Sequence, residues 1–74
     1  MEELNHILLF KTNISTDLCR AKMGAILDEL KGVIRWNVAL DDEDCVLRVI
    51  SHTLNHQEII KLVNSHGYEC TELE

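Results

Sequence analysis

The period of the hydrophobic pattern changes along the chain, and each change marks the boundary of a predicted element. Residues 4–12 contain four consecutive apolar positions, which is typical of a central strand with both faces partly covered. Residues 17–31 have a helical period instead, and Thr16 or Asp17 would cap this helix while Gly32 would end it. The apolar face of the helix would consist of Cys19, Met23, Ile26 and Leu30.

Residues 33–40 alternate between apolar and polar side chains, which predicts a second strand with one buried face. The residues predicted to face the core here are Ile34, Trp36, Val38 and Leu40. The acidic run at 41–44 predicts a turn, so residues 45–51 would return as a third strand that forms a hairpin with the second. Its predicted inward residues are Cys45, Leu47 and Val49.

A second helix is predicted over residues 55–66, where Asn55 and Glu58 have the spacing of a capping box. Gly67 would end this helix, and residues 68–73 would form a last short strand.

This order of elements matches the α+β class, and within it the ferredoxin-like βαββαβ sandwich. We expect one domain, residues 1–74, with a four-stranded antiparallel sheet and two helices on one face. The other sheet face would then expose an apolar set made of Ile7, Leu9, Val46 and Ile50. Such a set is either a face for a partner or a dimer, or scattered surface hydrophobic residues, and the pattern leaves both open.

The amino-acid composition argues against several classes of function. The 74 residues include 7 Lys and Arg against 13 Asp and Glu, a net charge of −6, which argues against nucleic acid or anionic lipid as partners. No apolar run is long enough for membrane insertion, and the start of the chain lacks a basic signal-peptide region, so we expect a cytoplasmic protein. We do not expect an enzyme, because the sequence contains neither a recognisable nucleophile with its base nor a glycine-rich phosphate-binding loop.

Cys19 is the strongest candidate for a functional residue in this sequence. It would lie in the first turn of a helix, where the dipole favours the thiolate, the form that binds soft metals. The alternative is that Cys19 is a small apolar residue at the start of the core face. The other cysteines, Cys45 and Cys70, fall on predicted inward strand positions and are expected to pack in the core.

At residues 14–19, Ile-Ser-Thr-Asp-Leu-Cys, the chain resembles the Met-X-Cys-X-X-Cys loop of heavy-metal-associated domains, the family of the copper chaperones. Matching positions run along nearly the whole chain: Phe10, Thr12, Met23, Leu30, Gly32-Val33, Trp36, Val38, Leu40, Ile59, Ile60 and Gly67-Tyr68. In this family two loop cysteines bind Cu(I) and pass it to a partner. Here Cys19 matches the second cysteine, whereas Thr16 replaces the first and Ile14 replaces the loop methionine.

The resemblance implies that Cys19 binds Cu(I) or another soft metal ion, with a second ligand from another chain, a small thiol or a partner. Three further residues would lie around Cys19 without binding the metal themselves, namely Thr16, His66 and Tyr68. His66 also falls on the face of Ile59 and Val63, which predicts a capping or half-buried side chain. One alternative is a metal-free interaction domain that binds a protein partner or forms a homodimer. A narrower one is a redox sensor that joins two copies through a Cys19–Cys19 disulfide.

Overall fold

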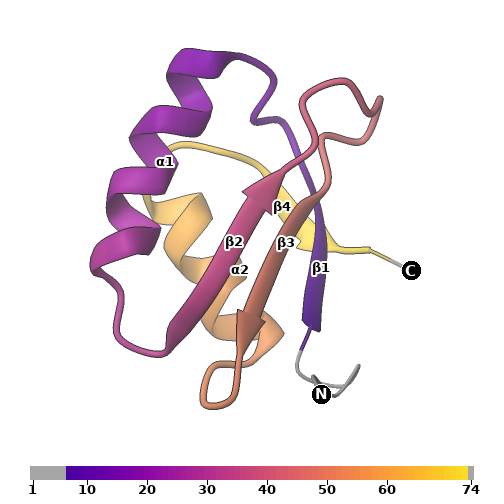
Figure 1. Ribbon diagram of the computed structural model, residues 1–74. Coiled ribbons are helices and arrows are strands. Elements are labelled where there is room, and N and C mark those ends of the chain that lie inside the picture. Colours follow the sequence, from indigo (N-terminus) through magenta and orange to yellow (C-terminus); the bar gives the residue numbers. More distant parts are fainter. Residues whose placement is uncertain (1–6, 74) are drawn as a thin grey trace.

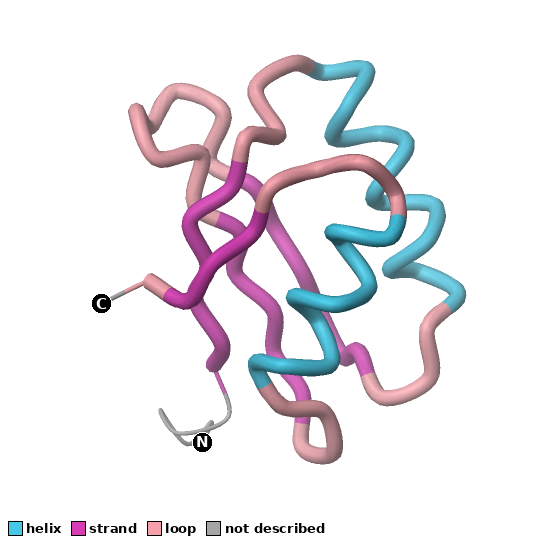
Figure 2. The backbone as a smooth tube through the Cα atoms, turned by 180° about the vertical axis from the view of Figure 1, so that it is seen from behind, coloured by secondary structure: helices cyan, strands magenta, loops and turns pink. Residues whose placement is uncertain are grey.

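The computed structural model describes residues 7–73 and has an α+β architecture. Its elements are β1 (Ile7–Thr12), α1 (Asp17–Glu29), β2 (Val33–Val38), β3 (Leu47–Ser51), α2 (His56–Ser65) and β4 (Cys70–Glu72). The four strands form one sheet in the order β2-β3-β1-β4, and every neighbouring pair is antiparallel. Both helices lie on the same side of this sheet (Figure 1), as the view from behind also shows (Figure 2). The predicted order of elements is confirmed, while residues 4–6 of the first predicted strand lie outside the described residues.

The core lies between the sheet and the helices. Strand β1 is central, and its inward residues Leu8 and Phe10 are buried opposite Val49 and Leu47 of β3. From the helices, Met23, Leu27, Ile59 and Val63 complete the apolar cluster. Removing this apolar surface from water is the main favourable term that holds the two layers together.

Local capping fixes both helix starts. Thr16 is the N-cap of α1, and its hydroxyl accepts a hydrogen bond from the Cys19 N–H at 3.1 Å. Asn55 and Glu58 form the predicted capping box at the start of α2, with bonds of 3.0 and 3.1 Å. Helix α1 ends at Glu29, two residues earlier than predicted, because the backbone is already extended at Leu30. None of the helices in residues 7–73 is long and apolar enough to cross a membrane.

Strand β2 corrects one prediction. Its register against β3 shifts between Val33 and Arg35, so the strand contains a bulge. Val33 lies opposite the buried Ser51 and packs against the core, whereas Ile34 is 56% exposed. The prediction that Ile34 faces the core is therefore wrong, because one extra residue reverses the alternation that precedes it.

On the face of the sheet away from the helices, the apolar residues are more covered than the pattern predicted. Ile7, Leu9 and Val46 are only partly exposed, and Ile50 is 7% exposed. The large hydrophobic side chains that are exposed among residues 7–73 are Leu18 and Ile34. This face is thus mixed in character, with polar side chains between the apolar ones.

Candidate functional site

Cys19 lies in the first turn of α1, three residues after the N-cap, and its side chain is partly exposed. The loop that leads to it is held from below by Ile14, which is fully buried. Thr12 fixes the same loop, since its hydroxyl donates to the Cys45 carbonyl at 2.7 Å and accepts from the Ile14 N–H at 3.2 Å. The thiol therefore lies at the surface, after a loop that is anchored by buried contacts.

Two hydroxyl groups converge on this thiol. Side-chain hydrogen bonds from Thr16, and then from Tyr68, hold the pKa of Cys19 below its ordinary value, and the positive charge of Lys22 adds to the effect. Partial desolvation acts in the opposite direction. The pKa of Tyr68 is raised in turn, first because its hydroxyl is hydrogen-bonded to Cys19. Both changes favour a thiolate at Cys19 beside a protonated phenol.

The C-terminal loop reaches Cys19 because it is tied to the first loop. The Asn13 N–H donates to the Glu69 carbonyl at 3.3 Å, and the Glu69 N–H donates to the Asn13 side-chain oxygen at 2.8 Å. The Tyr68 N–H donates to the carbonyl of Val63 in α2 at 3.3 Å. Together these bonds hold the Tyr68 side chain next to the start of α1.

The structure brings Cys19, Thr16 and Tyr68 together. His66 is different, because it is the C-cap of α2 and is exposed, with its N–H bonded to the Val63 carbonyl at 3.1 Å. The prediction of a capping or half-buried side chain is therefore met by its first alternative, and His66 is not among the groups that shift the pKa of Cys19. Lys22 was missed, although its place one turn after Cys19 on a predicted helix was a usable signal.

The other cysteines do not join this site. Cys45 and Cys70 are buried, and burial raises the pKa of Cys70 to about 11, so that thiol stays protonated at neutral pH. Within the described part of the chain, no group of three or more His, Cys, Asp or Glu side chains is arranged to hold a metal ion. Among residues 7–73, Cys19 is thus the cysteine with a partly exposed thiol.

The surroundings of Cys19 are open to another molecule. Leu18, the residue before it, is 65% exposed in the first turn of α1. An exposed leucine next to a partly exposed thiol offers an approaching chain both an apolar contact and a covalent or metal-binding group.

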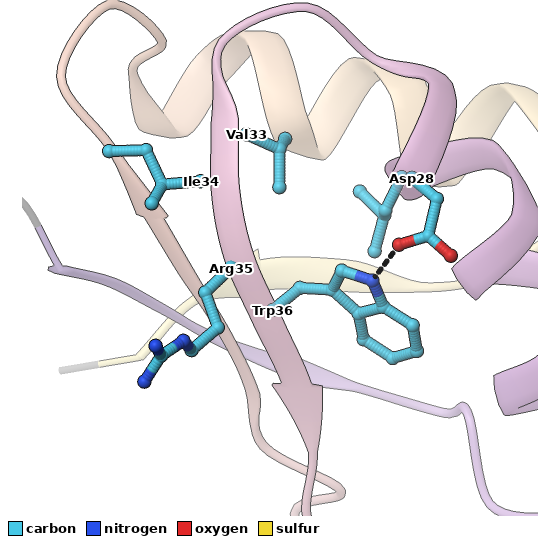
Figure 3. A pocket seen from close by; sticks show the side chains of 6 residues that line it. Asp28, Val33, Ile34, Arg35 and Trp36 are labelled. Atoms are coloured by element: carbon cyan, nitrogen blue, oxygen red, sulfur yellow. Dashed lines mark hydrogen bonds between the residues drawn. The ribbon is translucent and has the colours of Figure 1, made fainter.

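A separate hollow of about 310 Å³ lies between α1 and β2 and is shown in Figure 3. There the Trp36 indole N–H donates to Asp28 Oδ1 at 2.7 Å, and the indole lies so close to Gly24 that a Cβ at this position would meet the ring. The carboxylate is thus engaged in joining α1 to β2. This hollow carries no arrangement of a nucleophile and a base.

No protein-family model matches the chain, and a search of curated proteins finds no significant match.

Proposed function

We propose that the chain is a ferredoxin-like domain of the heavy-metal-associated type that binds a soft metal ion such as Cu(I) through Cys19. The second ligand would be the thiol of another copy, of a small molecule or of a protein partner. The observation that carries the proposal is the partly exposed Cys19 thiol, whose pKa is lowered by Thr16 and Tyr68. The strand order β2-β3-β1-β4, with both helices on one face, supports the ferredoxin-like assignment.

The chemistry follows from the donor set. Thiolates are preferred ligands of soft monovalent ions, whereas hydroxyl groups are poor ones, so Thr16 and Tyr68 would donate hydrogen bonds to the sulfur and leave the metal to Cys19. A two-sulfur site needs one more thiolate, which neither buried cysteine can supply. The surface position of Cys19 allows an external thiol to approach, which suits transfer of an ion between two proteins.

A Cu(I) titration in the presence of glutathione and a chromophoric competitor tests the proposal. The wild-type protein should withdraw Cu(I) from the competitor, and Cys19→Ser should lose this ability. Cys45→Ala is the matched control, because it removes a thiol from the same chain and keeps Cys19. Equal binding by wild type and Cys19→Ser would refute the proposal.

Restoring the missing sulfur gives a second measurement. Thr16→Cys places a thiol at the N-cap, one helical turn from Cys19, and should raise Cu(I) affinity by about 100-fold or more without glutathione. The N-cap bond would be weakened at a cost of about 1 kcal/mol in stability. An unchanged affinity in a folded Thr16→Cys protein would show that this loop does not have the geometry of a metal site.

A further inference from the structure

The sheet face away from the helices is cationic in a protein that is acidic overall. Lys11, Arg35 and Arg48 lie on this face, although the whole chain has 7 cationic residues against 13 acidic ones. Among the described strand residues, no Asp or Glu shares the face, since Glu72 lies opposite the inward-facing Phe10 and reaches His56 of α2. The strand residues of this face are thus cationic, in contrast to the net negative charge of the whole chain.

The strand register places the two arginines close together. Arg35 lies opposite Ile50, which lies opposite Ile7, and in the next row Asn37 lies opposite Arg48. Arg35 and Arg48 are therefore diagonal neighbours, about 7–8 Å apart at their backbones and within reach of one another's side chains. Figure 3 shows Arg35 leaving β2 on the side opposite to Trp36. These residues line a hollow of about 250 Å³.

The two guanidinium groups have no partner in the described part of the chain. Neither Arg35 nor Arg48 forms an ion pair or a side-chain hydrogen bond there, whereas Lys11 lies 3.5 Å from Asp44. Two neighbouring like charges repel one another, and a carboxylate placed between them would remove that repulsion. Guanidinium groups are also suited to bind carboxylates through paired hydrogen bonds.

We propose that this hollow, bounded by Arg35, Asn37 and Arg48 over a floor of Ile7 and Ile50, docks an acidic segment of a partner protein. One carboxylate lies between the guanidinium groups, and a neighbouring apolar side chain covers the partly exposed Ile7 beside the nearly buried Ile50. A partner protein is favoured over a second copy, because a symmetric pairing centred on this hollow would bring the same cations face to face. This inference does not depend on metal binding at Cys19.

Single-stranded nucleic acid fits this face less well than a carboxylate does. Binding of unpaired bases relies on aromatic side chains that stack with them. Trp36 also lines this hollow, but its ring packs against Gly24 of α1, on the opposite side of β2 from Arg35 (Figure 3). Phe10 is buried and Tyr68 lies at Cys19, so none of these three rings is placed to stack with a base beside the two arginines. The chemistry of the hollow therefore favours a peptide over RNA.

Titration of the ¹⁵N-labelled protein by NMR tests the proposal. The probe is a ten-residue peptide that contains Glu and Leu, and its control has the same sequence with Gln in place of Glu. We expect the acidic peptide to shift the amide signals of β2, β3 and β1 around the hollow. Arg35→Gln and Arg48→Gln should each weaken binding about 5- to 10-fold. Lys61→Gln removes the same charge from α2 and should leave the affinity unchanged.

Five outcomes would overturn the proposal, and four of them belong to the titration. They are the absence of shifts at millimolar peptide, equal binding of the Gln peptide, equal weakening by Lys61→Gln, and tighter binding of an oligouridine of the same length. Sedimentation provides a further check. A dimer that Arg35→Gln disrupts would show that the face binds a second copy. Thermal unfolding of each variant verifies that a lost signal reflects lost binding in a folded protein.

Discussion

Gly24→Ala should destabilise the protein, although the same change at most helical positions is stabilising. Gly24 is buried in the middle of α1, beneath the indole of Trp36. A Cβ added there would lie 2.6 Å from Cη2 of Trp36 and closer still to Cζ2, so either the ring or the helix must move. Moving the ring also disturbs its 2.7 Å hydrogen bond to Asp28.

Three terms set the expected size of the effect. Overpacking of a filled site costs about 1–3 kcal/mol, and loss of the exposed hydrogen bond between Trp36 and Asp28 costs about 1 kcal/mol. The higher helix propensity of alanine returns about 1 kcal/mol. The net loss is therefore about 2 kcal/mol, which for a domain of this size lowers the melting temperature by about 10 °C.

Urea unfolding followed by circular dichroism measures this loss, and a second background tests its cause. In a Trp36→Ala protein the obstructing ring is gone, so Gly24→Ala should there stabilise the fold by about 1 kcal/mol. The sign of the effect thus reverses between the two backgrounds. A stabilising Gly24→Ala in the wild-type background, or the same effect in both, would refute the packing argument.

Two further changes test the loop that holds Cys19. Tyr68→Phe removes a hydrogen bond to Cys19, so the pKa of this thiol should rise. The pH midpoint of its alkylation by iodoacetamide should then move upward. Glu69→Gln is the control, and an unchanged midpoint in Tyr68→Phe would contradict the role of Tyr68. The pKa of Cys19 is lower in the folded state than in the unfolded state, so the thiolate stabilises the fold above the unfolded-state pKa, and this contribution disappears as the pH falls through the folded-state pKa. In urea unfolding at a series of pH values, Tyr68→Phe should therefore reduce the dependence of the unfolding free energy on pH. Thr12→Val leaves the Cys45 carbonyl and the Ile14 N–H without their buried partner and should cost about 1–3 kcal/mol in urea unfolding, whereas Thr12→Ser should cost less; equal stability of the two variants would argue against the hydrogen bonds.

Features set by neighbouring residues were predictable from the sequence. The capping box of Asn55 and Glu58 depends on residues three apart, and the structure contains it at the predicted place. Thr16 was likewise one of two predicted caps, and it is the observed one. The helical and strand periods gave the order of all six elements for the same reason, since each period is a local property of its segment.

Features set by contacts between distant segments were not predictable in the same way. The bulge in β2 is defined by its register against β3, and no single-strand pattern contains that register. The contact of Tyr68 with Cys19 depends on Asn13, whose side chain binds the backbone of Glu69 far along the chain. A family resemblance pointed to Tyr68, but the residue that places it has no recognisable motif.

Because β4 is short, the pKa of the Cys19 thiol depends on local unfolding at the C-terminal edge of the sheet. Strand β4 has three residues and pairs with β1 at the edge of the sheet, so it separates at a lower free energy than the central strands. Each separation carries the neighbouring Tyr68 away from the thiol and returns the sulfur to a more ordinary pKa. The fraction of time that Cys19 is a thiolate at a given pH therefore depends in part on how often the C-terminal edge of the sheet frays.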